Sequence, residues 1–473
     1  MKKINNKGQS LLEVILALGL FAVAAGTVFV LLGSQFKSLE IVRDGTQAIS
    51  LAEEGLEGAR TIRDRDWDLL ALGNHGLKIS ENKWTFEGES DVNEDGYTRS
   101  ISVSELGVNE RMITSTVTWT PSYLRNQTIT LTSVLSNWRN LFEPLLSGDW
   151  SNPQTLGSVD LGAGESATSI AVRDKFIYLT ATANDSKKAD FFIVNATNGN
   201  NPLLVSSLKT GDGLNSVAIS GNYAYVANIN GNQLQIIDIS NTNNPLLVSS
   251  VGFPGNTEDG LSVAIFGQYA YVGSEKSSSQ EFYIVNVSNP ANPSVVGSLE
   301  IDANVNDIAV FGERVFLSTA KDSGEFIVVN VSDPVNPVIS ASLDILGATE
   351  DGKGIYINSQ DNKAYLVRTV GGDHDEHHEI AIIDVSSADN PTLLGSSNFG
   401  SSVNSVFAAD SLGFFATSYS NGEFQIFNVS DPSNIIAYSN LNFSQIATDI
   451  AFEDNTVYVS VRSNDALRII TSQ

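Results

Sequence analysis

Near its amino terminus the chain carries a long apolar run that continues into an amphipathic pattern. From Leu11 to Gly33 the sequence holds 23 residues with Glu13 as the single charge, which is long enough to cross a bilayer as a helix. Small and apolar residues then recur every three or four positions among charged ones: Ile41, Ala48, Leu51, Ala52, Gly55, Ala59 and Ile62. This period predicts one continuous helix from about Ser10 to about Arg65.

The next part of the chain alternates apolar and polar residues, as half-buried strands do. The segments SISVSEL, MITSTVTW and QTITLTSVL carry this alternation. We expect an antiparallel sheet over about residues 78–138, packed on the second half of the helix.

From Asn152 to Gln473 the chain repeats one pattern. The aligned units begin with a short apolar strand and continue through an Asn/Asp turn into a second strand, at Phe191, Leu234, Phe282, Phe326, Ile380, Phe424 and, truncated, Leu467. Successive starts lie 43, 48, 44, 54, 44 and 43 residues apart. Two further strands precede each unit, such as SVAIS at Ser216 and YAYVAN at Tyr223. Periods of this length made only of strands predict seven four-stranded propeller blades.

The two ends of the repeat region complement each other. The last copy stops after its third strand, whereas NPQTLGSVDL at Asn152 has the pattern of a fourth strand. An amino-terminal strand would complete the carboxy-terminal blade and remove two exposed sheet edges. The repeat is similar to the LVIVD family of propellers of prokaryotic surface proteins, through Ile236-Ile237-Asp238 and its counterparts Val285-Asn286, Val329-Asn330 and Ile383-Asp384. This resemblance implies a fold and little chemistry.

The amino terminus resembles that of type IV prepilins and pseudopilins. A basic leader, MKKINNKG, precedes the apolar helix, so cleavage after Gly8 would keep the helix in the mature chain. The resemblance implies a dedicated prepilin peptidase, methylation of the new amine at Gln9, and a role in filament assembly for Glu13, because a carboxylate in hydrocarbon is costly unless it is paired. The family usually has Phe where this chain has Gln9, and the mid-helix Pro common in pilins is missing.

The fold class is therefore multidomain. We expect a leader at residues 1–8, a pilin-like α+β domain at 9–143, a linker at 144–151 and an all-β, seven-bladed propeller at 152–473. A plain membrane anchor remains the alternative for the first segment.

Composition narrows the function classes. The chain has no Cys, which excludes disulfides and thiolate chemistry. The 54 acids against 27 bases give a net charge of −27, and we predict no nucleic-acid contact for the propeller. The nucleophile and zinc motifs of common hydrolases are absent, so we do not expect an enzyme.

The longest loops point to one face of the propeller. The blade-to-blade loops GFPGNTEDG and ILGATEDGKG both contain Thr-Glu-Asp-Gly, and the insertion GGDHDEHHE joins a second strand to a third, so all three emerge on the same side. Binding function is often carried by loops on a rigid scaffold. The candidate ligand-face residues are Glu258, Asp259, Glu350, Asp351, His374, His377 and His378.

Two segments carry possible metal ligands. The histidine-rich insertion would suit zinc, although a solvated acidic loop explains it too. Asp91, Asn93 and Asp95 precede Gly96 as in the first half of a calcium loop, but position twelve is Ser102, and a polar hairpin turn is the alternative. We predict no cofactor, with Ca²⁺ as the one candidate.

These patterns predict a minor pilin-like subunit that displays a non-catalytic propeller for adhesion or surface recognition. Its expected partners are other pilin subunits through the amino-terminal helix, the prepilin peptidase, an inner-membrane assembly platform and an unknown surface ligand. The chain would lie in the cytoplasmic membrane as a prepilin and then in a surface filament. The alternatives are a pseudopilin of a secretion or DNA-uptake machine whose propeller binds cargo, and a membrane-anchored propeller enzyme acting on glycans.

Overall fold

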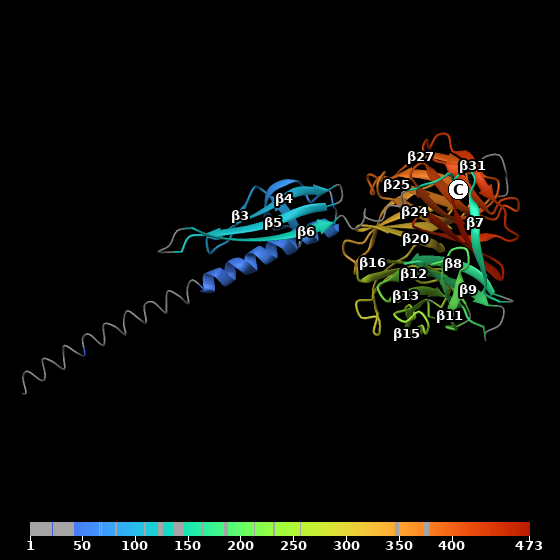
Figure 1. Ribbon diagram of the computed structural model, residues 1–473, viewed down its shortest axis with the longest axis horizontal. Coiled ribbons are helices and arrows are strands. Elements are labelled where there is room, and N and C mark those ends of the chain that lie inside the picture. The colour runs from blue at the N-terminus through green and yellow to red at the C-terminus, as the bar shows by residue number, and fades with distance from the viewer. Residues whose placement is uncertain are drawn as a thin grey trace, which may run out of the picture. The chain divides into compact units, whose positions relative to one another are not determined.

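The chain folds into two compact units, residues 1–141 and 142–473 (Figure 1). The computed structural model describes residues 21, 42–65, 67, 69–80, 83–107, 110–121, 126–136, 146–162, 165–183, 188–211, 213–229, 232–255, 257–345, 350–371 and 378–473. Gly8, Gln9, Glu13 and nearly all of the apolar run lie outside these residues, so their assigned roles stay predictions. Within the described part, no helix has the length and apolarity needed to cross a membrane.

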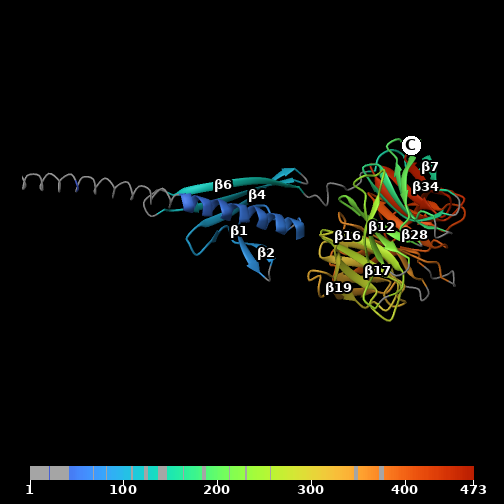
Figure 2. The ribbon, with the colours of Figure 1, turned by 90° about the horizontal axis from the view of Figure 1, so that it is seen from below.

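The first unit packs a helix against an antiparallel sheet. Residues 42–65 are helical and lie along one face of the sheet (Figure 2). The sheet order is β2-β1-β4-β5-β6, with the short β3 paired to β4. The strands are β1 (Gly73–Ser80), β2 (Lys83–Glu87), β3 (Asp91–Val92), β4 (Thr98–Gly107), β5 (Glu110–Trp119) and β6 (Gln127–Ser136).

Small residues let this helix approach the sheet closely. Ala48, Ala52 and Ala59 are fully buried against apolar side chains of β4 and β5. A Cβ on Gly55 would lie 2.3 Å from Ser115 Oγ, so only glycine fits where the helix crosses β5. The period of small and apolar positions along the sequence therefore marks the face of the helix that is buried.

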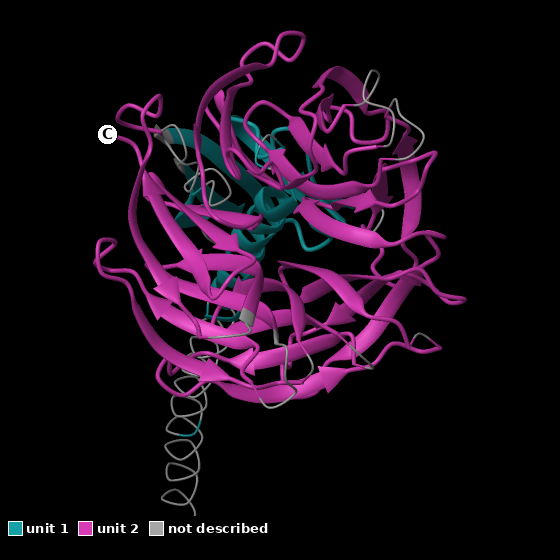
Figure 3. Ribbon diagram, turned by 90° about the vertical axis from the view of Figure 1, so that its right-hand side faces the viewer, with its two compact units in different colours: residues 1–141 teal, residues 142–473 magenta. Residues whose placement is uncertain are grey.

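The second unit is a β-propeller. Its described residues form seven four-stranded antiparallel sheets arranged as a ring, which Figure 3 shows along its axis. We number the blades along the chain from the blade that begins with β8. From its first strand to its fourth, blade 1 consists of β8 (Glu165–Arg173), β9 (Phe176–Ala183), β10 (Phe191–Asn195) and β11 (Leu203–Leu208). Blade 2 consists of β12 (Leu214–Ser220), β13 (Tyr223–Asn228), β14 (Leu234–Asp238) and β15 (Leu246–Val251). Blade 3 consists of β16 (Gly260–Phe266), β17 (Tyr269–Ser274), β18 (Phe282–Asn286) and β19 (Ser294–Leu299). Blade 4 consists of β20 (Val305–Phe311), β21 (Arg314–Thr319), β22 (Phe326–Asn330) and β23 (Val338–Leu343). Blade 5 consists of β24 (Gly352–Asn358), β25 (Lys363–Arg368), β26 (Ile380–Asp384) and β27 (Thr392–Ser397). Blade 6 consists of β28 (Val403–Ala409), β29 (Leu412–Thr417), β30 (Phe424–Asn428) and β31 (Ile436–Leu441). Blade 7 consists of β32 (Ala447–Glu453), β33 (Thr456–Val461), β34 (Asp465–Thr471) and β7 (Gln154–Asp160).

Blade 7 is completed by the amino-terminal strand of the unit. β7 pairs antiparallel with β34, and Val159 lies opposite Leu467 in the register. The fourth-strand pattern at residues 152–161 predicted this pairing. It joins the two ends of the propeller and covers the edge that β34 would otherwise expose, with β7 as the outer strand of the blade.

The first strand of each blade lies innermost and contacts the first strands of both neighbouring blades. The second and third strands are almost continuously apolar and buried, because blades pack against both of their faces.

A turn follows the third strand of blades 1 to 6. The side-chain oxygen of the last strand residue accepts the backbone N–H two residues on, for example Asn286 from Ser288 and Asn428 from Ser430. The Asn/Asp turn predicted after the short apolar strand is therefore present in the structure.

Candidate functional site

The innermost strand of every blade carries a β-bulge near its start. In blade 2, for example, Leu214 pairs with Asn228 and Ser216 with Ala227, which leaves Asn215 as the extra residue. We call the seven extra residues the ring: Thr168, Asn215, Leu261, Asn306, Lys353, Asn404 and Thr448. A bulge unpairs one residue and redirects its side chain, and in this propeller it turns seven side chains towards the axis.

Five ring residues link their blade to the next one. Each donates a side-chain hydrogen bond to the carbonyl of the residue directly before the bulge in the neighbouring inner strand. The donor–acceptor distances are 2.6 Å for Thr168 to Leu214, 2.8 Å for Asn215 to Gly260, 2.6 Å for Asn306 to Gly352, 2.7 Å for Asn404 to Ala447 and 3.1 Å for Thr448 to Ala167. The short polar side chains of the ring therefore have a structural task at the junctions between blades.

Two ring residues depart from this pattern. Leu261 has no donor, and the next residue, Ser262, donates to the carbonyl of Val305 instead, at 2.9 Å. Lys353 is followed by Gly354, which has no side chain to take over the bond. Among the described residues, the Lys353 side chain makes no hydrogen bond and no ion pair.

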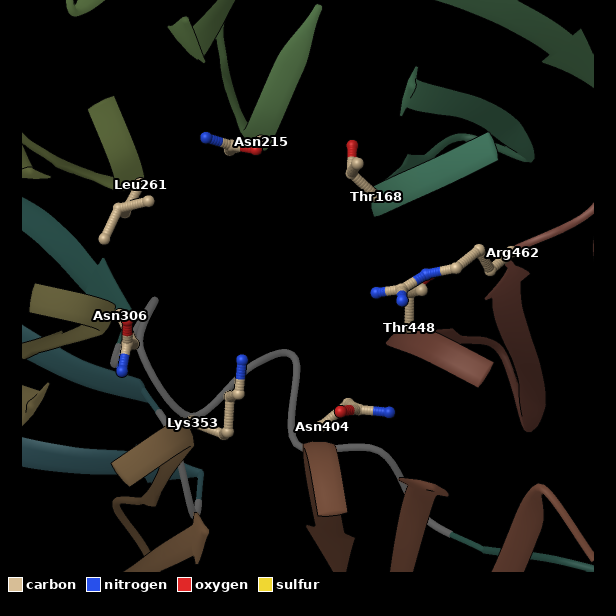
Figure 4. A pocket seen from close by; sticks show the side chains of 8 residues that line it. All are labelled: Thr168, Asn215, Leu261, Asn306, Lys353, Asn404, Thr448 and Arg462. Atoms are coloured by element: carbon tan, nitrogen blue, oxygen red, sulfur yellow. The ribbon is translucent and has the colours of Figure 1, made fainter. Parts of the chain in front are cut away.

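The ring lines a cavity of about 220 Å³ at the end of the propeller axis where the inner strands begin. Arg462, which follows β33, is the eighth lining residue. In Figure 4 the Lys353 ammonium and the Arg462 guanidinium both point into the open space between the blades. Arg462 makes no side-chain hydrogen bond or ion pair with the described residues either, although its backbone N–H donates to the carbonyl of Ile446.

A second layer of polar side chains follows the ring along the axis. The residues directly after the bulges are mostly serines, with Asp307 in blade 4 and Asp449 in blade 7. Asp449 accepts hydrogen bonds from the hydroxyls of Ser169 and Ser405, both at 2.7 Å. Burial raises the pKa of Asp449, and it raises the pKa of Asp307 to about 7, with the charge of Asp449 acting in the same direction.

The predicted acidic residues lie on the same face, but none of them lines the cavity. Glu258 is exposed, Asp259 is half-buried and Glu350 is buried. Burial raises the pKa of half-buried Asp351, while the Lys353 ammonium lowers it. Their assignment as ligand-binding residues stays a prediction. The loops that carry them also have a structural role.

The two Thr-Glu-Asp-Gly segments bring the chain into an inner strand. A Cβ on Gly260 would lie 2.4 Å from the carbonyl oxygen of Gln233, and one on Gly352 would lie 2.6 Å from Ser318 Oγ. The carbonyls of these two glycines accept the bonds from Asn215 and Asn306. Close packing at these points is a structural reason for the repeated motif.

The histidine-rich insertion is only partly described. His374 and His377 lie outside the described residues, and His378 is half-buried with its carbonyl accepting from Arg368 Nε at 3.0 Å. In the described part of the chain, no group of three His, Cys, Asp or Glu side chains could hold a metal ion. Zinc binding by this loop stays a prediction.

A set of buried carboxylates was not recognised in the sequence. In blades 1 to 6 an acid or a glutamine directly precedes the third strand, and its side chain accepts the backbone N–H of a residue 20 positions on, in the blade-to-blade loop. These residues are Asp190, Gln233, Glu281, Glu325, Glu379 and Glu423, all at most 4% exposed. Their recurrence at one position of the repeat is the signal that could have identified them as loop anchors.

In the first unit, the candidate calcium ligands have separate partners. Asp91 pairs with Arg99 at 2.9 Å and accepts the backbone N–H of Leu77. Asn93 accepts the N–H groups of Asp95 and Tyr97, and Asp95 accepts from Gln47 Nε2 at 2.7 Å. These bonds fit the hairpin alternative and do not direct the three side chains towards one ion.

The comparisons with known proteins support the fold. The LVIVD repeat model matches residues 214–252, 255–300 and 303–345, which are blades 2, 3 and 4. The chain therefore contains LVIVD repeats. No curated protein matches it in sequence.

Among solved structures, the chain is similar to a catalytically inactive virginiamycin B lyase from Staphylococcus aureus with quinupristin, at 11% identity and a TM-score of 0.51. It is also similar to the Cps50 (Swd1) beta-propeller domain of Myceliophteria thermophila, at 12% identity and a TM-score of 0.51. Each match covers 68% of this chain and 100% of the other. At this identity the likeness establishes a propeller and carries no activity with it.

Proposed function

We propose that the chain is a subunit of a type IV pilus-like filament and displays its propeller as a non-catalytic recognition domain. The observation that carries the recognition part is the cavity at the ring, because all seven blades contribute a redirected side chain to it and two of its lining cations have no partner in the described structure. Cavities with convergent polar groups on a rigid scaffold are the usual place for a ligand.

The filament part of the proposal rests on the amino-terminal half. The leader ending at Gly8, the apolar run and Glu13 are the sequence features of a prepilin. A helix whose face of small residues packs on an antiparallel sheet is consistent with them. The filament would hold the propeller away from the cell envelope, and the propeller would contact the target surface.

A recognition role is favoured over catalysis by the lining of the cavity. It consists of hydroxyls, amides, one leucine and two cations, with no pair of carboxylates to serve as acid and base. No residue that lines it belongs to a nucleophile–base arrangement of the kind used in acyl transfer.

The proposal is tested with a deletion strain that carries the gene again on a plasmid. We expect the deletion to leave filaments intact and to reduce attachment to the target surface, and the plasmid to restore attachment. Loss of all filaments in the deletion strain would indicate a priming pseudopilin. Unchanged filaments together with unchanged attachment would contradict the proposal.

A further inference from the structure

We infer that the cavity at the ring binds a single oxyanion group, a carboxylate or a sulfate, carried on a small polar ligand such as an acidic sugar. This inference deepens the proposed function and rests on it. Its basis is the placement of Lys353 and Arg462, whose side chains face the cavity and have no hydrogen-bond or ion-pair partner among the described residues.

Lys353 replaces a side chain that would stabilise the ring. At the equivalent position, Asn215, Asn306 and Asn404 each bond to the next inner strand. Lys353 does not, and the following Gly354 cannot compensate as Ser262 does beside Leu261. Blade 5 therefore gives up a side-chain bond that the other six blades make, and places an exposed ammonium in the cavity. Residues that lower stability in this way are often functional.

Other cations of the propeller have partners for their side chains. Lys209 and Lys321 donate to backbone carbonyls. The chain has twice as many acids as bases, and three further cations have carboxylate partners: Lys276 with Asp302 at 2.6 Å, Arg314 with Asp389 at 3.0 Å and Arg468 with Asp465 at 2.9 Å. Lys353 and Arg462 have none at ion-pair distance among the described residues, and both face the same cavity. Two cations that face one cavity repel each other, and an anion between them removes that repulsion.

The size and lining of the cavity limit the ligand. Its 220 Å³ is below the range of about 300–1,000 Å³ typical of sites for drug-sized molecules, so it suits one small group. A guanidinium offers two parallel N–H donors to a carboxylate or a sulfate, and the amides and hydroxyls of the ring can meet hydroxyl groups beside that anion. Leu261 provides one apolar contact.

The charge of the whole chain disfavours a polyanion. The net charge of −27 repels a strongly charged polymer, whereas a ligand with one charge experiences little of this repulsion beyond about 8 Å at physiological salt. Within the cavity the two nearby cations dominate. The inference is therefore limited to a monosaccharide-sized anion or to the anionic end of a larger neutral glycan.

The test measures binding of glucuronate, inorganic sulfate and glucose to the full-length chain in detergent, by isothermal titration calorimetry. The variants are Lys353→Gln, Arg462→Gln and the double variant. Lys276→Gln is the matched control, because Lys276 lies on a loop of the same face but is paired with Asp302. An unchanged midpoint of thermal unfolding shows that each variant is folded.

We expect glucuronate to bind the wild type at least about tenfold more tightly than glucose, each single variant to lose about tenfold, and the double variant to bind neither anion. Lys276→Gln should bind as the wild type does. Competition between sulfate and glucuronate would indicate that the site recognises the negative charge alone. Failure of sulfate to compete with glucuronate would indicate that the site is specific for a carboxylated sugar. Equal binding of glucuronate and glucose, no binding of either anion, or binding retained by the double variant would overturn the inference.

The two proposals fail in different ways. If glucuronate binds as expected but deletion of the gene leaves attachment unchanged, the anion site stands and surface recognition is wrong. If deletion abolishes attachment but a chromosomal double variant attaches normally, recognition stands and the anion site is wrong.

Discussion

Asn215, Asn306 and Asn404 stabilise the junctions between blades through side-chain hydrogen bonds. Lys353 at the equivalent position makes no such bond and lines the cavity instead. Replacement of Lys353 by Asn should restore the side-chain bond to the inner strand of blade 6 that Asn215 and Asn306 make in their own blades. We expect a gain in unfolding free energy of about 1 kcal/mol, measured by denaturant titration, together with a loss of about tenfold in anion affinity. Lys353→Gln is the control, since its longer amide should weaken binding without the same gain. A loss of stability in Lys353→Asn would contradict the role assigned to the ring.

Asp307 gives the propeller a pH dependence. Its folded pKa is raised to about 7, so the protonated form is favoured in the folded state. The contribution of the protonated Asp307 carboxyl to the unfolding free energy is complete below the unfolded pKa of about 4. It is lost as the pH rises through the folded pKa of about 7. Replacement by Ser, the residue at this position in blades 1, 2, 3 and 6, should flatten the decrease of the unfolding midpoint between pH 4 and pH 7. Parallel pH profiles for the wild type and Asp307→Ser would show that this carboxyl group does not titrate as described.

At the scale of elements, the buried anchors of blades 1 to 6 hold the blade-to-blade loop that follows to the start of the third strand. Glu423 accepts the backbone N–H of Phe443, and Gln233 makes the equivalent bond to Phe253 with an amide oxygen. Glu423→Ala leaves that N–H buried without its partner and should cost about 2 kcal/mol of unfolding free energy, whereas Glu423→Gln should cost less than about 1 kcal/mol. Equal losses in the two variants would mean that the carboxylate charge, and not the accepted bond, stabilises the loop.

The pairing of β7 with β34 closes the ring of blades, and it can be tested with two adjacent residues. Val159 is buried among Ile170, Leu179 and Leu467, whereas Ser158 on the other face of the strand is exposed. Val159→Asp buries a charge and should cost about 3 kcal/mol or more, while Ser158→Asp should change the unfolding free energy by less than about 0.5 kcal/mol. Limited proteolysis of Val159→Asp should cut first in blades 7 and 1. A stable, protease-resistant Val159→Asp variant would argue against closure by this strand.

The elements were largely predictable, and the site was not. Runs of four apolar residues followed by Asn, such as FYIVN and FIVVN, predicted the third strands because both of their faces are buried, and the fourth-strand pattern at Asn152 predicted β7. The predicted first strand of blade 2 began at Ser216, but β12 begins at Leu214, and the ring residue Asn215 lies between them. A bulge depends on pairing register, which a single strand sequence does not show.

A repeated signal for the ring is nevertheless present. LNSVA, VNDIA, VNSVF, ATDIA and ATSIA share an apolar residue, Asn or Thr, then Ser or Asp before the buried positions. Lys353 in GKGIY breaks this pattern. The charged loops were selected from the sequence instead, because their unusual composition can be recognised without knowledge of the strand register. The convergence of the ring residues on the propeller axis becomes apparent only when all seven blades are in place.

At the scale of the whole molecule, we assign separate tasks to the two units. The first unit would anchor the chain in a filament, and the propeller would present an anion-binding cavity on one face. With a propeller more than twice the length of the first unit, incorporation at every position of a filament would be crowded. We therefore expect a minor subunit, at filament tips or sparse along the shaft.

The most direct measurement is immunogold electron microscopy of sheared surface filaments, with antibody raised against the propeller. We predict gold at filament tips or sparsely along the shaft in the wild type, and none on filaments of a strain that carries Glu13→Ala. Gold confined to the cell envelope in the wild type, with none on filaments, would contradict the filament subunit and leave a membrane-anchored propeller in its place.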